Sequence, residues 1–186
     1  MSGDKYYISD QHGCYFVTFT VIHWIDIFSR RNYRDIIIES LNFCIAKKGL
    51  IVYSWVIMSN HIHLIITTKN KTIKISNLIC DFKKHTSKEI VKKIKIINES
   101  RREWLLNAMG KEATRIGRAP NFKLWRDDNH AILIDGKIVD IIGKLNYIHE
   151  NPVRNGIVEN DWEYIYSSAK DYQINKKGLV NIDFAF

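Results

Sequence analysis

Two histidines separated by a single residue, His61 and His63, are the side chains of this sequence best suited to chemistry. They lie in residues 58–66, where apolar residues follow a Ser-Asn pair that is typical of a tight turn. Alternate residues of a strand point to opposite faces, so both imidazoles share one face and Ile62 occupies the other. Two neutral imidazoles side by side can form half of a metal site or bind a phosphate. Half-buried surface histidines are the alternative interpretation, so a second feature is needed to decide.

That second feature is Tyr147, in a predicted helix over residues 138–151. The helix has one apolar stripe, made of Ile138, Ile141, Ile142, Leu145 and Ile148. At about 100° per residue, Tyr147 projects almost opposite to this stripe, and Asn151 lies one turn further on the same side. A tyrosine kept off the apolar face of its own helix is a surface, interface or site residue. His149 falls on the stripe and is predicted to be a packed structural residue.

The charge of the chain indicates its class of partner. Its 186 residues include 28 Lys and Arg against 20 Asp and Glu, a net charge of +8. Nine lysines fall between Lys69 and Lys95, where only Asp81 and Glu89 are acidic. Such a segment attracts polyanions, most commonly nucleic acid, although a solvated helix face gives the same pattern. No apolar run is long enough to span a bilayer, so we expect no membrane association.

Hydrophobic periodicity predicts strands and helices that alternate along the chain without repeats. The expected strands are residues 14–21, 50–58, 61–66, 122–125 and 130–134, and the expected helices are residues 32–48, 74–97, 101–109 and 138–151. This order is typical of an α+β fold, ferredoxin-like or RRM-like, with helices packed on one face of an antiparallel sheet. We expect a single domain over residues 1–186.

The segments between these elements give further expectations. Pro152 is predicted to end the last helix, because proline biases the preceding residue away from helix. Residues 110–121 are rich in Gly and Arg and are expected to form a basic, flexible loop, while residues 155–186 form a tail that wraps the domain. Three widely spaced cysteines indicate reduced core thiols in a cytoplasmic protein; these are Cys14, Cys44 and Cys80.

In their order along the chain, these features resemble the single-tyrosine HUH transposases, and in particular the REP-associated tyrosine transposases. The resemblance extends from Tyr15 to Tyr172 and rests on the histidine pair, Tyr147 and nearby motifs. Those motifs are Asn-Pro-Val-Arg at residues 151–154, Gly156, Trp162 and Tyr-Ser-Ser at residues 166–168.

The resemblance implies metal-dependent cleavage and rejoining of single-stranded DNA, the chemistry of DNA transposition. His61 and His63 would bind Mg²⁺ or Mn²⁺, and Asn151 would supply a third ligand through its amide oxygen. The family often has glutamine at this place, so Glu150 stays open as the alternative ligand. Tyr147 would attack the scissile phosphate to give a 5′-phosphotyrosine bond and a free 3′-hydroxyl. That bond retains the energy of the phosphodiester, so a second DNA end can be joined without ATP.

The expected partner is single-stranded DNA, with hairpin ends as a possible form. Lys83, Lys84 and Lys88 lie on the long basic helix and are expected to contact the DNA backbone. Lys144 lies one turn before Tyr147 and would contact phosphate or stabilise the phenolate, unless it is only a solvated helix lysine. Some family members form homodimers that share the tyrosine helix, whereas the REP-associated branch tends towards monomers.

Two other functions stay open. Another HUH endonuclease, a replication initiator or relaxase, would place its tyrosine near the N-terminus, where Tyr6, Tyr7 and Tyr15 are available. A non-catalytic RRM-like nucleic-acid-binding protein would use the basic face and the aromatic residues without metal or covalent adduct. The position of Tyr147 after the histidines favours the transposase. His130 either faces the site or belongs to an edge strand.

Overall fold

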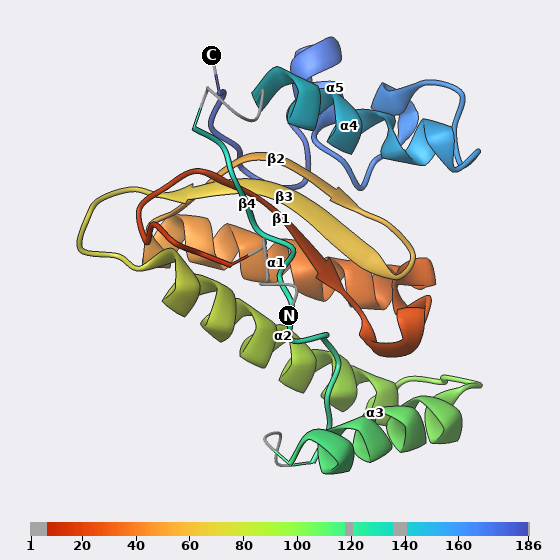
Figure 1. The fold of residues 1–186 in the computed structure, drawn as a ribbon. Coiled ribbons are helices and arrows are strands. Elements are labelled where there is room, and N and C mark those ends of the chain that lie inside the picture. The colour runs from red at the N-terminus through yellow and green to blue at the C-terminus, as the bar shows by residue number, and fades with distance from the viewer. Residues whose placement is uncertain (1–6, 118–120, 136–140, 186) are drawn as a thin grey trace, which may run out of the picture.

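The computed structural model describes residues 7–117, 121–135 and 141–185. One four-stranded antiparallel sheet forms its centre (Figure 1). The strands are β1 (Tyr15–Thr20), β2 (Leu50–Ile57), β3 (His61–Thr68) and β4 (Ile132–Leu133), and the main helices are α1 (Arg31–Lys48), α2 (Ile75–Ile96), α3 (Arg102–Ile116), α4 (Ile141–Arg154) and α5 (Ala169–Gln173). Short 3-10 helices, η1 (Ile22–Trp24), η2 (Ile27–Ser29) and η3 (Asp161–Glu163), connect them.

The strand order is β2-β3-β1-β4, and neighbouring strands are antiparallel throughout. Helix α1 leads from β1 past the central strand to β2, a β2–β3 hairpin follows, and α2 and α3 lead back to β4. This is the ferredoxin-like arrangement expected from the sequence, and the α+β prediction is confirmed.

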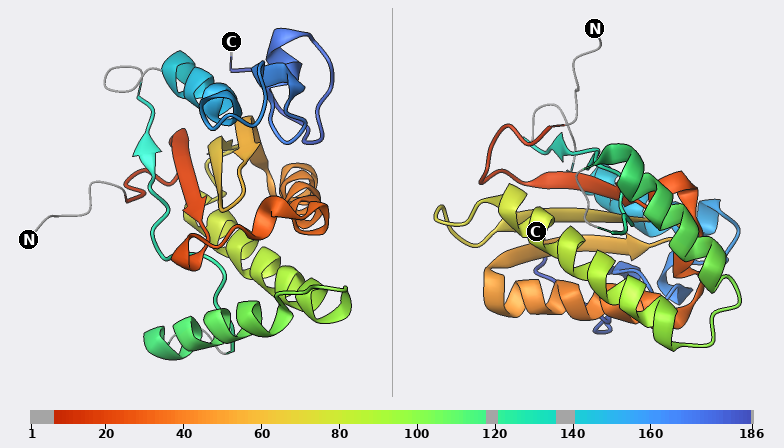
Figure 2. Two further views of the ribbon diagram at one scale, coloured as in Figure 1. Left: turned by 90° about the vertical axis from the view of Figure 1, so that its right-hand side faces the viewer. Right: turned by 90° about the horizontal axis from the view of Figure 1, so that it is seen from below.

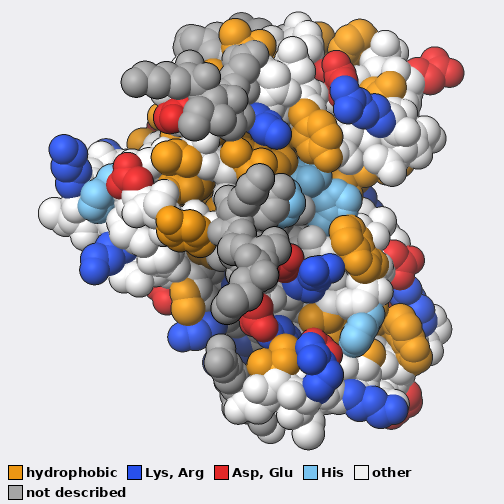
Figure 3. Space-filling view, in the orientation of Figure 1, with side chains coloured by type: hydrophobic (Ala, Val, Ile, Leu, Met, Phe, Trp, Pro, Cys, Tyr) orange, Lys and Arg blue, Asp and Glu red, His pale blue; other side chains and the backbone are white. Residues whose placement is uncertain are grey.

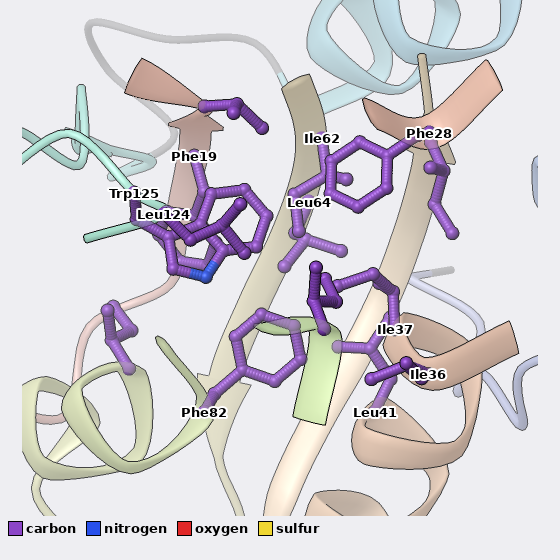
Figure 4. Close-up of a cluster of buried hydrophobic side chains, with 14 of the residues drawn as sticks. Phe19, Phe28, Ile36, Ile37, Leu41, Ile62, Leu64, Phe82, Leu124 and Trp125 are labelled. Carbon is purple, nitrogen blue, oxygen red and sulfur yellow. The ribbon is translucent and has the colours of Figure 1, made fainter. Parts of the chain in front are cut away.

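The two faces of the sheet are covered by different helices (Figures 1 and 2). Helices α1 and α2 pack on one face, where Phe19, Ile62 and Leu64 meet Phe82 and Leu41 in the main core (Figure 4). Helix α4 packs on the opposite face, so the expectation that the helices share one face is wrong for α4. The reason is that a second set of strand residues is also apolar and must be covered; it comprises Phe16, Val56 and Ile65.

Strand β2 is an edge strand, yet its backbone is paired on both sides. The C-terminal segment runs beside it: Ile57 donates its N–H to the carbonyl of Tyr166 at 2.9 Å, and Ser168 donates to Trp55 at 3.0 Å. Further along the same edge, Asp183 donates to Val52 at 3.0 Å. The expected wrapping tail is therefore present, and it protects an edge that would otherwise be open to strand pairing.

Two helix boundaries differ from the sequence-based prediction. Helix α3 continues to Ile116, so residues 110–116 of the predicted basic loop are helical. Gly117, with φ of 65°, ends α3 in the left-handed conformation, and residues 118–120 of the loop lie outside the described residues. Helix α4 includes Pro152 and ends at Arg154. In this last turn the proline removes only its own N–H, and its carbonyl still accepts a hydrogen bond from Ile157 at 2.9 Å.

The cysteines are free thiols, as expected. Cys44 is buried and Cys14 half-buried, and burial raises the pKa of Cys14 to about 11. Cys80 is exposed on α2, so the prediction that it lies in the core is wrong. Within the described part of the chain, no helix has the length and apolar character needed to cross a bilayer.

A buried carboxylate fixes the start of α3 to α1. Glu99 accepts hydrogen bonds from the Tyr33 hydroxyl at 2.9 Å and the Arg101 backbone at 3.1 Å, and pairs with Arg30 at 2.8 Å. Burial alone would raise the pKa of Glu99, but these donors outweigh it and hold the pKa below its usual range. The stabilisation is therefore fully present above the unfolded pKa of about 4.3 and is lost as the pH falls through the folded pKa.

We expect Glu99→Gln to lower the free energy of unfolding by about 2–4 kcal/mol, because it leaves Arg30 without its buried partner. Urea denaturation at pH 7 measures this loss, and the exposed Glu103→Gln is the control, with an expected change below about 1 kcal/mol. Equal stability of the two variants would show that the Glu99 cluster does not hold α3.

Candidate active site

The histidine pair lies at the start of the central strand β3, on the face that α4 covers. His61 pairs with Thr20 and His63 with Thr18 across the β1–β3 ladder, so both side chains project to the same side. Their ring centroids are 4.6 Å apart. Figure 3 views the molecule from the β4 edge of the sheet and shows pale blue histidine side chains together near its centre, beside hydrophobic side chains. The alternation inferred from the sequence is thus confirmed, with Ile62 buried in the core on the other side.

Each imidazole is oriented by a hydrogen bond at Nδ1. His63 Nδ1 lies 2.8 Å from the Thr18 hydroxyl, and His61 Nδ1 lies 2.6 Å from the Asn60 amide oxygen. An amide oxygen accepts, so His61 carries its proton on Nδ1 and presents a lone pair at Nε2. Hydrogen bonds at the far nitrogen are the usual way in which metal-binding histidines are held. Two neutral imidazoles held in this way are donors of the type that a divalent cation accepts.

Burial keeps both rings neutral. Burial lowers the pKa of His61 to about 4. Burial first, and then positive charge on His61, His130 and Lys144, together lower the pKa of His63 to about 3. Neutral imidazoles have the lone pairs that a metal needs. His130 is exposed and lies two residues before β4, so it is not part of the edge strand that was one of the two positions expected for it.

Tyr147 lies beside the histidines of its own chain. Its ring centroid is 5.4 Å from that of His63 and 5.9 Å from that of Phe16, and 36% of the residue is exposed. Helix α4 brings it there because Leu145 and Ile148 are buried against the sheet, while Tyr147 leaves the helix at another angle. Ile142, expected on the buried stripe, is 50% exposed, so that part of the prediction is wrong. Ile138 is outside the described residues.

His149 anchors this helix to β2. It is 1% exposed, and its Nε2 lies 2.9 Å from the Ser168 hydroxyl and 3.2 Å from the Ser54 hydroxyl. Burial lowers its pKa to about 4. The predicted structural role is confirmed, and this buried contact fixes the rotation of α4 that sets the position of Tyr147.

The two candidates for a third ligand differ in their surroundings. Asn151 is buried, and its amide oxygen accepts a hydrogen bond from the Asn155 amide at 3.2 Å, which leaves a second lone pair. Glu150 is exposed and forms an ion pair with Arg154. Among the described residues, no group of three or more His, Cys, Asp and Glu side chains could hold a metal. With ligands from the described residues alone, a site on the histidine pair would therefore be completed by an amide, water or substrate oxygen.

Two cations flank Tyr147 on α4. The Lys144 ammonium lies 5.9 Å and the Arg154 guanidinium 5.6 Å from the centroid of the tyrosine ring. Both place positive charge where a phosphate would approach the tyrosine, although the Arg154 guanidinium already donates to Glu150. The role of Arg154 was missed in the sequence, although its place seven residues after Tyr147, two helical turns on, is a signal that could have found it.

The segment before β4 runs antiparallel beside β1 and carries His130. Trp125 bridges to Val21, and Ile132 pairs with Phe16. Between these two pairs the segment advances seven residues, from Trp125 to Ile132, whereas the β1 side advances only five, from Phe16 to Val21. The segment therefore has two extra residues, which form a bulge. Two separate strands were expected here; only the second is formed, as β4, and the first is reduced to the single bridge at Trp125.

Lys83 holds this bulge to α2. Its ammonium donates to the Arg126 carbonyl at 2.7 Å and to the Asn129 amide oxygen at 2.8 Å. Burial lowers its pKa to about 8. Lys84 and Lys88, by contrast, are exposed along a groove of about 1020 Å³ between α2 and residues 121–129. The structure thus separates the three lysines: one supports the fold, and two are available to a ligand on the face opposite to the histidines.

The family model described as "Transposase IS200 like" matches residues 14–120, more than half of the chain and the part that contains both histidines. The chain belongs to this family. The match ends before α4, so Tyr147 of this IS200-like transposase lies outside the matched residues.

A solved structure of a REP-associated tyrosine transposase bound to a REP hairpin has the same fold as this IS200-like transposase. The TM-score is 0.59, the sequences are 19% identical, and the match covers 100% of this chain and 96% of the other. In that comparison the α+β architecture extends over α4 and the C-terminal segment. No curated protein sequence matches this transposase.

Proposed function

We propose that this IS200-like transposase cleaves single-stranded DNA with Tyr147 as nucleophile and transfers the cleaved end to a second strand. One observation supports this most: the Tyr147 ring lies 5.4 Å from the His63 ring within one chain. A tyrosine and an imidazole pair from distant parts of the sequence converge on one partly open face. A non-catalytic nucleic-acid-binding protein has no need of that convergence.

The transfer consists of two exchanges at one phosphorus atom. The Tyr147 hydroxyl loses its proton and bonds to the phosphorus, while the bond to the 3′-oxygen of the preceding nucleotide breaks and that oxygen takes up a proton. The product is a 5′-phosphotyrosine and a free 3′-hydroxyl. The 3′-hydroxyl of a second strand reverses these bond changes and releases the tyrosine, so no external energy source is needed.

We propose that His61, His63 and the Asn151 amide oxygen hold Mg²⁺ or Mn²⁺. Such a cation supplies charge that offsets the negative scissile phosphate. Lys144 and Arg154 add positive charge on the tyrosine side, and the buried Phe16 beneath the rings keeps water away from that edge. Because all these groups come from one chain, the proposed site needs no second subunit.

Other tyrosines are less suited to the attack. Tyr15 is fully buried on the α1 and α2 face, and its hydroxyl accepts a hydrogen bond from the backbone N–H of Asp10 at 2.8 Å. Tyr7 is exposed, and Tyr6 lies outside the described residues. The relaxase-like alternative therefore rests on these last two.

A direct assay of this proposal uses single-stranded DNA labelled at its 3′ end, with hairpin-bearing and unstructured oligonucleotides in parallel. With Mg²⁺, we expect a protein–DNA adduct that survives a denaturing gel and that does not form when EDTA is present from the start. A cleaved product without adduct would indicate hydrolysis by water. If no oligonucleotide gave either an adduct or a cleaved product, the proposed activity would be contradicted.

The exposed α2 lysines are the proposed contacts to the DNA backbone. We expect Lys84→Glu with Lys88→Glu to weaken binding of single-stranded DNA about tenfold, and the slope of log affinity against log salt to fall by about 1.4. Fluorescence anisotropy over a salt series measures both. Lys176→Glu with Lys177→Glu gives the same change of net charge on exposed residues of the C-terminal segment and is the control. Equal losses in both double variants would assign the effect to net charge alone.

A further inference from the structure

A tryptophan lies at the open end of the histidine pair. Trp24 follows β1 in η1, and its ring centroid is 6.3 Å from that of His61, with the two planes at 77°. The residue is 56% exposed. Tryptophan is among the side chains best able to stack on a nucleobase, because its flat π-face is large and every base has a matching one. An exposed tryptophan next to a proposed DNA-cleaving pair therefore offers a base-stacking surface.

The backbone holds this side chain outward at a cost. Both His23 and Trp24 have positive φ, 51° and 56°, in the left-handed region that residues with a side chain disfavour. The flanking residues Ile22 and Ile25 are buried and fix the turn from both sides. A strained conformation that buried neighbours maintain and that exposes a large aromatic ring is a feature expected at a binding site.

The ladder between β1 and β3 gives the order of the groups along the sheet. Thr18 pairs with His63, Thr20 pairs with His61, and the chain then continues to Trp24. Tyr147 lies at the other end, against His63 and Phe16. Along the sheet the side chains therefore follow the order Tyr147, His63, His61 and Trp24. The tyrosine and the tryptophan lie on opposite sides of the histidine pair.

The geometry of an in-line displacement at phosphorus indicates which nucleotide Trp24 would contact. The attacking and leaving oxygens lie on opposite sides of the phosphorus, so the leaving 3′-oxygen points away from Tyr147. We propose that Trp24 stacks on the base of the nucleotide that carries this 3′-oxygen, the one immediately 5′ to the scissile phosphate. The inference rests on the proposed function, since it takes Tyr147 as the nucleophile.

Arg126 completes this surface. Its guanidinium lies 5.8 Å from the centroid of the Trp24 ring, and its backbone N–H donates to the Thr20 carbonyl at 2.9 Å. Asp128 pairs with the guanidinium at 3.2 Å and orients it. The ring is therefore supported by a cation on the bulged edge segment, and that cation can also contact a phosphate of the stacked nucleotide.

Binding to two decamers of equal charge tests the stacking. One is dT10 and the other is a chain of ten abasic deoxyribose phosphates, each labelled for fluorescence anisotropy. We expect Trp24→Ala to lose about tenfold affinity for dT10 and none for the abasic chain, while Trp24→Phe retains most of the dT10 affinity. Trp104→Ala is the matched control, because Trp104 is 54% exposed but lies on α3. Equal dT10 binding by Trp24→Ala and the wild type would overturn the inference.

Cleavage tests which nucleotide is stacked. The cut position in a pooled single-stranded library is located by sequencing the released fragments, and single abasic residues are then placed on either side of it. We expect the abasic residue 5′ to the cut to slow adduct formation by the wild type about tenfold and to leave Trp24→Ala unaffected. If adduct formation were slowed only by an abasic residue on the 3′ side of the cut, the assignment of the stacked nucleotide would be wrong. A wild type that neither binds dT10 nor cleaves the library would instead overturn the proposed function itself.

Discussion

Tyr147→Phe will lower formation of the covalent protein–DNA adduct by at least about 1000-fold, because it removes the only atom that we propose to bond to phosphorus. The ring contacts with His63 and Phe16 do not involve the hydroxyl, so the free energy of unfolding should change by less than about 0.5 kcal/mol. Binding of single-stranded DNA should also be unchanged. Denaturing gels, urea denaturation and anisotropy measure the three quantities separately.

Tyr164→Phe is a control with the opposite profile. The Tyr164 hydroxyl donates to the Ile57 carbonyl at 2.8 Å and so ties the C-terminal segment to β2. We expect the Tyr164→Phe variant to lose about 1 kcal/mol of stability and to retain adduct formation. Wild-type adduct levels in Tyr147→Phe would remove this residue from the reaction.

Replacement of His61 by alanine will reduce both cleavage and Mn²⁺ affinity by at least about 100-fold, since one of two proposed imidazole ligands is lost. Isothermal titration with Mn²⁺ and the adduct assay measure the two losses. His61 is the cleaner of the two positions, because His63 is only 5% exposed and bonded to Thr18. His63→Ala should therefore also lose about 1–3 kcal/mol of stability.

The exposed His85 on α2 is the matched control for the histidine variants. We expect His85→Ala to cleave DNA and bind Mn²⁺ as the wild type does. If His61→Ala matched it in both assays, the pair would not be a metal site. If only metal binding survived in His61→Ala, the ion would have to be held elsewhere than on the histidines.

The periodic spacing of apolar residues was sufficient to predict those strands and helices in which each residue is either clearly buried or clearly exposed. The alternation in residues 61–66 predicted the histidine face, and the apolar stripe of α2 predicted its length closely. It failed where tertiary contacts outweigh local preference. Pro152 stays helical because only its own N–H is lost, and Ile142 is 50% exposed although it projects to nearly the same side of α4 as the buried His149, two turns later.

The candidate site could be predicted only in part. The histidine pair and Tyr147 are visible as motifs, but Trp24 depends on a turn with two left-handed residues that no local pattern in the sequence announces. Lys83 shows the converse. It falls within a run of lysines and was predicted to contact DNA. Its ammonium instead donates hydrogen bonds to Arg126 and Asn129, more than forty residues further along the chain. Charge patterns along a chain do not show which charges another segment has already neutralised.

The central claim is tested most directly by identifying the amino acid that is joined to DNA. Adduct formed with Mg²⁺ and single-stranded DNA can be digested with protease and nuclease, and the nucleotide-bearing peptide sequenced by mass spectrometry. The account predicts a 5′-phosphate ester on Tyr147, in the peptide that contains residues 145–154. A nucleotide on Tyr6 or Tyr7 would contradict it and would instead support the relaxase-like arrangement.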